Sequence, residues 1–468
     1  MKKKYVRWTL WTIASPFILF IILCILIYLP PIQNFLVDKA AVYASEATGM
    51  NISVERISLS FPLNLVVTNV DAASPHNDTL LSVRRLQVNV QLLPLLKKQV
   101  EVDGISLQGA TVNSNDLIHG MKLNGTLGEL FISSHGVALD PETAIVNKVL
   151  LKDTDLSLCL NDTAAADTAA SDTAYWKIIL QDIDLQNVSF ALDMPLDSLS
   201  LAASLDNAIL RDGLIDLHKS AYSLQTFRIE NGRVRYDNGK PLAADSLSSG
   251  LDPSHIALTD IGVKLDSLYY GGRNMKAIIS QFVLKERSGV EIVSATGRMV
   301  SNDKVLRVPS LKLETRDSYL ELNAAMDWNA LDFKDEGLVS ARLMADIGKP
   351  DVVRFMGSMD EKFIRQYPSE PLRIRTGIDG DLNKLKLTTL TAELPGALGL
   401  FARGELTHLT DSLLRGGDIT LEAETKDLKF VSTLAEGIEI PYGTRLEGKF
   451  TMAGTKMGTD LLLMQPEA

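Results

Sequence analysis

The stretch Leu86-Gln87-Val88-Asn89-Val90-Gln91-Leu92 decides the fold class, because apolar and amide side chains alternate in it without interruption. Successive side chains of a β-strand point to opposite faces of a sheet, so this alternation predicts a strand with one apolar and one polar face. The apolar positions are candidates for lining an apolar sheet face: Leu86, Val88, Val90 and Leu92.

The same period of two returns along most of the chain. The clearest further runs are 52–59, 182–192, 256–265, 277–284 and 311–322. They are rich in Val, Ile, Leu, Thr and aromatic residues and are bounded by Gly, Asn, Asp or Ser, which is typical of strands. We therefore predict a mainly β fold built on a long antiparallel sheet. Two of the runs supply the remaining candidates for the apolar face: Ile183, Leu185, Ile256 and Leu258.

No Pro/Gly-rich linker divides residues 51–468, so we expect one elongated β-structure rather than a series of small sandwiches. Twist accumulates in a long sheet, and curling the sheet along its length is one way to bury one of its faces. The sequence therefore predicts a curled, groove-shaped sheet with an apolar interior. Such an interior would accommodate acyl chains.

Two segments interrupt the strand pattern. Residues 350–367 place apolar side chains at helical spacing after a Lys-Pro boundary, which predicts one helix. Residues 161–174 repeat Asp-Thr-Ala at every fifth position and are too small and polar to pack, which predicts a flexible loop. Asp-Thr before a small aliphatic residue also resembles an O-glycosylation signal of some Gram-negative envelope proteins. The alternative interpretation is a plain turn sequence.

The N-terminus predicts a membrane anchor. Residues 8–29 are apolar, and about 22 residues of helix span roughly 33 Å, against a hydrocarbon core of about 30 Å. The cytoplasmic tip, residues 1–7, carries the cations that keep it inside: Lys2, Lys3, Lys4 and Arg7. Anchor residues that span the core or sit near its ends are Trp8, Trp11, Pro16, Phe20, Tyr28 and Leu29.

A cleaved signal peptide is the alternative to an anchor, but its apolar region would be shorter and would end at a small-residue cleavage site. This run instead ends Tyr28-Leu29-Pro30-Pro31. Residues 32–49 then predict a short amphipathic helix beside the membrane, with Gly49 as its C-terminal stop.

Composition excludes several classes of partner. The net charge is −11 and the part after the anchor has no Lys/Arg cluster, which argues against nucleic acid and against docking on anionic lipid by charge alone. Cys24 falls within the predicted anchor and Cys159 within an apolar strand, so no disulfide is expected.

The sequence contains no motif of an enzyme active site. Phosphate-binding glycine loops, H-E-x-x-H, C-x-x-C and G-x-S-x-G are absent, and the six histidines are scattered. Two carboxylate pairs, Asp153/Asp155 and Asp182/Asp184, could bind a cation but are more typical of a solvated strand face. We expect no catalytic residue, no cofactor and no metal site.

A succession of segments matches one known pattern from the N-terminus onward: 32–35, 52–63, 65–70, 78–83, 86–96, 100–112, 232–237, 265–270 and 285–289. In order and pattern, the chain resembles the N-terminal region of the TamB family, within the AsmA-like superfamily of Gram-negative envelope proteins. The resemblance implies a single-pass inner-membrane protein whose bulk forms a β-groove in the periplasm. Family members are typically longer, so we expect their C-terminal domain to be lacking here.

The resemblance also implies two roles in outer-membrane biogenesis. The first, favoured by an apolar groove, is to carry phospholipid between the membranes. The second is to assemble or secrete outer-membrane proteins together with an outer-membrane barrel protein, by pairing sheet edges with client strands. A passive structural tether is a third interpretation, and an enzyme is a remote fourth.

Overall fold

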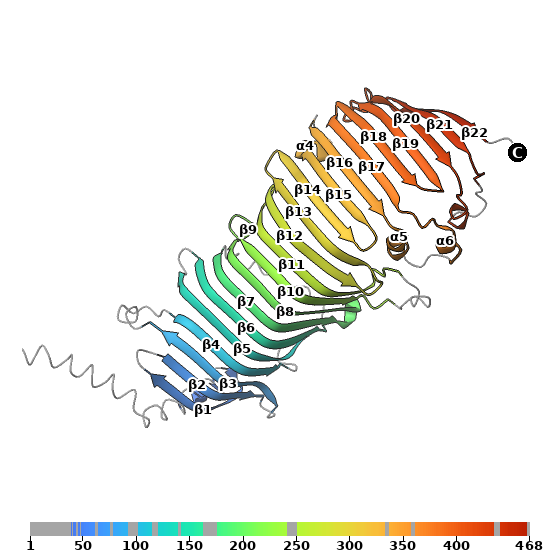
Figure 1. The fold of residues 1–468 in the computed structure, drawn as a ribbon. Helices are drawn as coiled ribbons and strands as arrows, with labels where there is room; N and C mark the ends of the chain where they lie inside the picture. The colour runs from blue at the N-terminus through green and yellow to red at the C-terminus, as the bar shows by residue number, and fades with distance from the viewer. Residues whose placement is uncertain are drawn as a thin grey trace, which may run out of the picture. The chain divides into compact units, whose positions relative to one another are not determined.

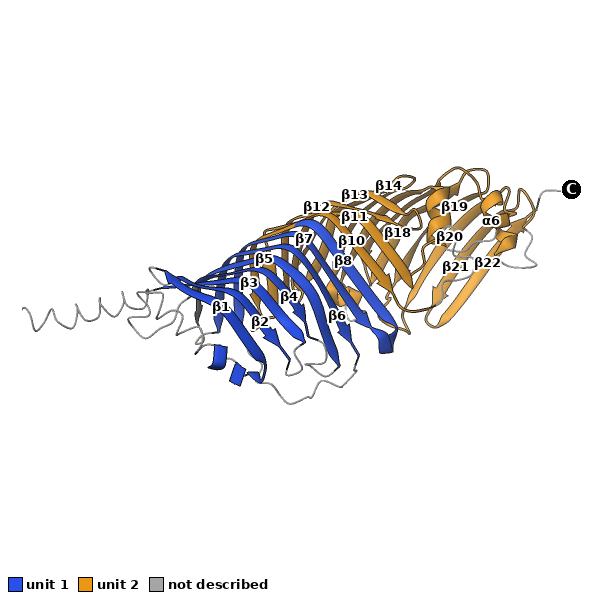
Figure 2. Cartoon of the chain, turned by 90° about the horizontal axis from the view of Figure 1, so that it is seen from below, with its two compact units in different colours: residues 1–207 blue, residues 208–468 orange. Residues whose placement is uncertain are grey.

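The computed structural model describes residues 39, 41–43, 45–46, 48–60, 64–74, 78–91, 102–114, 120–138, 142–161, 176–240, 250–332, 337–356, 361–434 and 440–465. The predicted anchor, its cytoplasmic tip, Leu92 and residues 162–174 of the predicted loop lie outside this part of the chain. None of the helices within it combines the length and the apolar character that crossing a bilayer requires. The chain divides into two compact units, residues 1–207 and 208–468 (Figure 2).

The prediction of a mainly β fold is confirmed, since strands make up most of the described residues (Figure 1). The strands of unit 1 are β1 Asn51–Ser60, β2 Asn64–Ala73, β3 Thr79–Val90, β4 Val102–Asn113, β5 Met121–Ala138, β6 Thr143–Leu160 and β7 Lys177–Met194, with the first part of β8 Leu199–Asp216. From β1 to β6 each strand pairs with the next one in antiparallel fashion.

The pairing of β6 with β7 corrects the prediction of a wholly antiparallel sheet, because these two strands run parallel. Parallel neighbours need a connection of a dozen or more residues to bring the chain back to the same end of the sheet. The low-complexity segment 161–176 supplies that length. Its composition predicts a surface loop, but composition does not reveal that β7 runs in the same direction as β6.

A helical segment precedes the sheet of unit 1. The described residues between Lys39 and Thr48 are helical, and Gly49 follows with a φ of +70°, a left-handed conformation that favours glycine. The N–H of Gly49 donates to the Ser45 carbonyl at 2.9 Å. The N–H of Ile52 donates to Ser45 Oγ at 3.0 Å, which ties the end of the helix to the start of β1.

Unit 2 continues with a meander. Its strands after β8 are β9 Ala221–Leu224, β10 Thr226–Asp237, β11 His255–Gly271, β12 Asn274–Glu286, β13 Glu291–Ser301, β14 Val305–Thr315, β15 Tyr319–Asp327, β16 Leu338–Ile347, β17 Leu372–Asp381, β18 Lys384–Leu394, β19 Leu398–Thr407, β20 Gly416–Thr425, β21 Arg445–Ala453 and β22 Lys456–Met464. From β10 to β22 each strand pairs antiparallel with the next, while β9 and β10 follow one another along the same edge of β11. The strands of each unit bend along their lengths, so each sheet is curved (Figure 2).

Two short helices stand where the sequence predicts one helix over 350–367. They are α5 Lys349–Phe355 and α6 Glu361–Gln366, and a further single turn, α4 Trp328–Leu331, lies between β15 and β16. Met356 follows the last residue of α5, and Gly357 comes next in the sequence; glycine costs about 1 kcal/mol more than alanine within a helix. The apolar spacing therefore predicts correctly that this segment is helical, but it does not predict the interruption between α5 and α6.

Buried polar groups hold α5 against the turn between β14 and β15. The Asp351 carboxylate is 1% exposed and accepts hydrogen bonds from the hydroxyls of Thr315 and Ser318, the latter at 2.6 Å. Arg354 Nη1 lies 3.1 Å from Asp351 and 2.8 Å from Asp317. Because the burial of this carboxylate is matched by donors, the cluster fixes the position of α5.

The compact apolar cores of unit 2 lie at strand ends. One comprises Phe363, Tyr367, Leu394, Ala397, Leu428 and Phe430, and the other comprises Ala330, Val339 and Leu382. Both form where turns and short helices meet the ends of strands. The central parts of the strands are therefore free to present a different kind of surface.

Candidate functional site

Apolar side chains form continuous rows across the sheet of unit 1. Residues directly opposite one another on neighbouring strands share a face of the sheet, so the strand register shows which side chains line up. Row 1 consists of Leu59, Leu65, Val88, Ile105, Ile132, Val149 and Ile183. Row 2 consists of Ile57, Val67, Leu86, Leu107, Leu130, Leu151 and Leu185. Every member of both rows is Leu, Ile or Val, one from each strand from β1 to β7.

These rows are not covered by a second layer in the described part of the chain. None of their members is buried there; all are half-buried except Ile105, which is 37% exposed. A sheet face packed against another layer would bury side chains of this type almost completely. Unit 1 therefore presents an open apolar sheet face.

The opposite face of the same strands is more polar: beside row 1 its residues are almost all polar, and beside row 2 polar residues alternate with Val66, Phe131 and Leu150. One residue along from row 1, the aligned residues are Ser60, Asn64, Asn89, Gly104, Ser133, Lys148 and Asp182. The sheet of unit 1 is thus amphipathic in cross-section. An apolar ligand and water would meet different faces of it.

A bend keeps the apolar face continuous along each strand. Asn69, Gly109, Asp153 and Asn187 have φ between +48° and +61° and lie at one level of β2, β4, β6 and β7. Side chains of Asx type tolerate this conformation, and Asn187 Nδ2 donates to Asp153 Oδ1 at 2.9 Å. Beyond the bend the apolar positions shift by one residue.

The shifted positions form row 3: Val54, Val70, Val83, Ala110, Leu127, Thr154 and Val188. Its central members are more buried than rows 1 and 2, with Val83 at 5%, Ala110 at 9% and Thr154 at 2% exposure. Row 3 is therefore the more enclosed part of the apolar face. Strict alternation does not predict it; the sequence signal is two polar residues between apolar ones, as in Val67-Thr68-Asn69-Val70.

Unit 2 carries a comparable apolar row. Row 4 consists of Ile229, Val263, Phe282, Ala295, Leu313, Leu320, Ala345, Ile374, Ala392, Leu400, Ala423, Leu446 and Leu463, one from each strand from β10 to β22. Only Ala295 and Ala345 are buried, and Leu463 is 57% exposed. The apolar face of unit 2 is therefore open in the same sense as that of unit 1.

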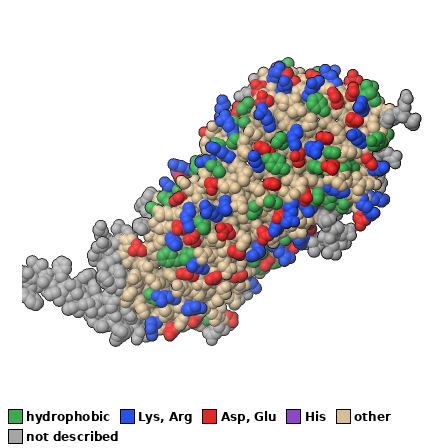
Figure 3. All heavy atoms as spheres, in the orientation of Figure 1, with side chains coloured by type: hydrophobic (Ala, Val, Ile, Leu, Met, Phe, Trp, Pro, Cys, Tyr) green, Lys and Arg blue, Asp and Glu red, His purple; other side chains and the backbone are tan. Residues whose placement is uncertain are grey.

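Ion pairs between strands characterise the opposite face of unit 2. Examples are Lys312–Glu321 at 3.8 Å, Arg373–Glu393 at 3.8 Å, Arg375–Asp346 at 2.7 Å, Lys384–Glu405 at 3.0 Å, Lys449–Asp418 at 3.4 Å and Arg445–Glu424 at 3.7 Å. Figure 3 shows both signs of charge interspersed over one side of the molecule. Solvated pairs of this kind mark a surface that faces water.

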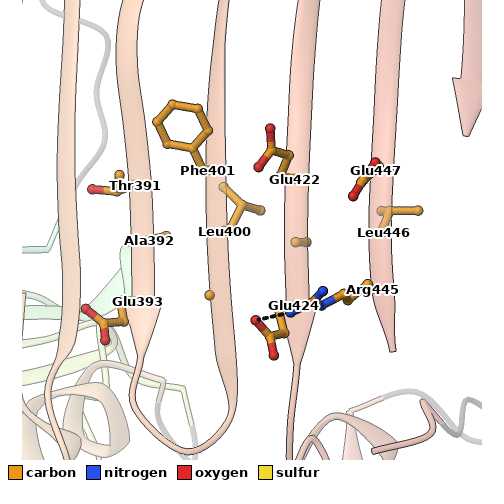
Figure 4. A pocket seen from close by; sticks show the side chains of 12 residues that line it. Thr391, Ala392, Glu393, Leu400, Phe401, Glu422, Glu424, Arg445, Leu446 and Glu447 are labelled. Carbon is orange, nitrogen blue, oxygen red and sulfur yellow. Dashed lines mark ion pairs between the residues drawn. The ribbon is translucent and has the colours of Figure 1, made fainter. Parts of the chain in front are cut away.

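A hollow of about 490 Å³ lies over β18 to β21 (Figure 4). The carboxylates among its lining residues come from Glu393, Glu422, Glu424 and Glu447, and Arg445 pairs with Glu424 at its edge. Gly399, also in the lining, has no side chain to fill the space. Phe401 and the row 4 residues Ala392, Leu400, Ala423 and Leu446 also line it, so carboxylates and apolar residues both border this hollow.

The sequence-predicted lining residues fall into separate places. Leu86, Val88, Ile183 and Leu185 belong to rows 1 and 2, and they are brought onto one face by the unbroken strand pairing from β3 to β7. Val90 pairs with Val102 beside them.

Ile256 and Leu258 lie in unit 2, where they pair with Tyr236 and Val234. Both are half-buried. The eighth candidate, Leu92, lies outside the described residues.

Titratable groups cluster at the start of β11 rather than on the apolar faces. His255 is 8% exposed, with Nδ1 2.7 Å from Asp252 and Nε2 3.6 Å from Asp237. The hydrogen bond with His255, followed by that from the Ser254 N–H, lowers the pKa of Asp252. These contacts close the connection between β10 and β11. No group of three or more His, Cys, Asp or Glu side chains suited to a metal ion occurs within the described ranges.

No family model matches the chain, and no curated protein matches it in sequence.

Proposed function

We propose that the apolar faces hold phospholipid acyl chains and that the protein carries phospholipid between the inner and outer membranes of a Gram-negative envelope. The observation that supports this proposal is the continuity of rows 1 and 2: an unbroken surface of Leu, Ile and Val that is half-exposed from β1 to β7. Large open apolar surfaces on soluble parts of proteins mark sites of interaction.

An acyl chain fits the chemistry of these rows. Removing apolar surface from water contributes about 25 cal/mol for each Å², or about 0.8 kcal/mol for each CH₂ group, and requires no hydrogen-bonding partner. An acyl chain lying across the strands of unit 1 would pass from one aliphatic side chain to the next without crossing a polar one. The same property would allow it to slide along a row with little change in free energy.

The envelope location in this proposal rests on the sequence. The apolar segment 8–29 with its preceding cations supports a cytoplasmic N-terminus and an exported body. The resemblance to the TamB family supports an inner-membrane anchor and a role in outer-membrane biogenesis. We infer no catalytic step, because the apolar rows offer no nucleophile, acid or base.

Photocrosslinking at matched positions tests the proposal. A photoreactive amino acid replaces Val88 or Ile132 of row 1, or their neighbours Asn89 or Ser133 on the polar face, in the full-length chain expressed in cells. Phospholipid should be captured at Val88 and Ile132 and should be almost absent from products at Asn89 and Ser133. Equal capture on both faces, or none on either, would exclude lipid carriage along these rows.

One observation favours the alternative role in outer-membrane protein assembly or secretion. β22 pairs with β21 on one side and with no other described strand, and its Leu461, Leu462 and Leu463 are 50%, 56% and 57% exposed. An apolar strand edge of this kind can add a strand from a client or from an outer-membrane barrel protein. That role predicts protein, not lipid, in crosslinked products at Leu462.

A further inference from the structure

Cations on the polar face of unit 2 commonly face an acidic side chain on the adjacent strand. Lys312 with Glu321 and Lys449 with Asp418 are two such pairs. Opposite charges at neighbouring strand positions stabilise a sheet, whereas like charges destabilise it. A group of cations on this face that lacks acidic partners therefore implies an anion supplied from elsewhere.

Lys276 of β12, Arg298 of β13 and Arg307 of β14 form such a group, here called the cationic triad. Lys276 and Arg307 both pair with Val300, and Arg298 lies two residues from Val300 in the same strand, so the three side chains leave one face of the sheet. Diagonal neighbours in a sheet are roughly 7–8 Å apart. All three residues are exposed, and within the described residues none of them forms an ion pair.

Acidic residues near the triad are engaged by neutral donors. Asp266 accepts a hydrogen bond from the Ser280 hydroxyl, and Asp303 accepts one from Asn274 Nδ2 at 2.9 Å. Asp327 accepts one from the N–H of Leu338 at 3.2 Å. These carboxylates shape the surrounding turns and bulges, and they do not pair with the triad.

The residues around the triad are amphipathic. Tyr269 pairs with Lys276 and is 40% exposed, while Val300 and Ile278 lie half-buried between the cations. Exposed tyrosine beside Lys and Arg is the composition found where proteins meet the headgroup zone of a membrane. An acidic protein surface would match the charges but would not account for the tyrosine and the aliphatic side chains.

We propose that the cationic triad and Tyr269 form a docking surface for the anionic headgroups of a phospholipid bilayer. The surface lies on the face of unit 2 opposite to row 4, so it is separate from the face proposed to hold acyl chains. This docking proposal holds whether or not the protein carries phospholipid along its apolar faces. It also refines the argument from composition, since a net charge of −11 conceals a local group of unpaired cations.

Crosslinking to bilayers of defined charge tests the docking surface. The full-length chain in neutral detergent carries a photoreactive amino acid in place of Ser310, which pairs with Arg298. It is mixed with nanodiscs of phosphatidylcholine alone, or with nanodiscs that also contain phosphatidylglycerol. Lipid capture should require phosphatidylglycerol and should fall at least about tenfold in the K276Q/R298Q/R307Q variant. Raising NaCl from about 0.05 M to about 0.5 M should weaken it similarly.

A matched variant controls for the loss of charge. K312Q/K384Q/K449Q removes three cations of the same face that have acidic partners, and capture at Ser310 should change less than about twofold. The salt dependence of capture is measured on the chain that keeps Lys276, Arg298 and Arg307. It therefore tests the docking surface even if the triple variant folds poorly.

Four outcomes would overturn the proposal. These are equal capture from neutral nanodiscs, capture that does not respond to salt, release by inorganic phosphate at constant ionic strength, and a protein as the main photoproduct at Ser310 in cells. The third would indicate a site for free phosphate and the fourth an acidic protein partner. Lipid capture at Val88 tests the acyl-chain face, and lipid capture at Ser310 tests the docking surface. One of the two proposals can therefore fail without affecting the other.

Discussion

Val88 and Asn89 are adjacent in β3 but belong to different surfaces of unit 1. Val88 lies between Leu65 and Ile105 in row 1, whereas Asn89 lies between Asn64 and Gly104 on the polar face. Substitutions at these two positions therefore distinguish the contribution of the apolar face from the general stability of β3.

Aspartate at these two positions should have unequal effects. Val88→Asp places a carboxylate among aliphatic side chains and should cost about 1–3 kcal/mol of local stability, with loss of lipid capture at Ile132. Asn89→Asp should change local stability by less than about 0.5 kcal/mol, because the position lies in the polar row and aspartate keeps the oxygen that accepts from Gln87 Nε2 at 3.0 Å. Hydrogen exchange of β3 amides and crosslinking yield measure the two effects. Similar effects at both positions would show that the face assignment is wrong.

The bend at Asn187 predicts a second contrast. Its φ of +52° suits glycine and asparagine but not a β-branched residue. Asn187→Val and Asn187→Gly both remove the hydrogen bond to Asp153, so the difference between them isolates the backbone. The valine variant should be less stable than the glycine variant by about 1–2 kcal/mol, measured by hydrogen exchange across β6 and β7. Equal stability would mean that the left-handed conformation is not required.

The sequence predicts the strands and the face of residues such as Val88 and Ile183 because side-chain alternation is a local property. It does not predict row 3, because the left-handed residues at the bend shift the apolar phase by one position while the strand register stays continuous. Three segments carry the missed signal, two polar residues after an apolar one at the bend: Val67-Thr68-Asn69, Leu151-Lys152-Asp153 and Leu185-Gln186-Asn187. These segments lie at one level of β2, β6 and β7, so the break in alternation is a feature that these strands share.

Long-range strand pairing explains the other features of the structure that the sequence does not predict. The parallel alignment of Val149 with Ile183 depends on where the chain returns after residue 160, which no local pattern encodes. The cationic triad is equally hidden, since Lys276, Arg298 and Arg307 lie on three consecutive strands and become neighbours only through the register of those strands.

The cluster around Asp351 predicts strong local coupling between α5 and the β14–β15 turn. Asp351→Ala removes a carboxylate that is 1% exposed and leaves two hydroxyls without their acceptor and Arg354 with Asp317 as its remaining partner, so it should destabilise this region by about 1–3 kcal/mol. Asp317→Ala removes a more exposed partner of Arg354 and should cost less than about 1 kcal/mol. Hydrogen exchange at Ser318 and Val352 would report both changes. A small effect of Asp351→Ala would show that α5 is held mainly by its apolar contacts.

The connection between β10 and β11 should weaken in acid. Hydrogen bonds from His255 and from the Ser254 N–H lower the pKa of Asp252 below its ordinary value of 3.8. A carboxyl whose pKa is lower in the folded state contributes stability that is fully present above its unfolded pKa and is lost as pH falls through the folded pKa. Protection of the His255 amide, which donates to the Asp252 carbonyl at 3.0 Å, should therefore be constant near neutral pH and decrease below about pH 3.8.

The variant Asp252→Asn separates this carboxyl from the general effect of acid on the chain. It should lower protection of the His255 amide at pH 7, because the charged acceptor for the imidazole and for the Ser254 N–H is gone. It should also remove most of the further loss between pH 5 and pH 3 at that amide. Asp303→Asn, at a carboxyl that accepts from Asn274 in a different turn, should leave the acid response of His255 unchanged. If Asp252→Asn retains the full acid response, protonation elsewhere controls this connection and the lowered pKa of Asp252 has no part in it.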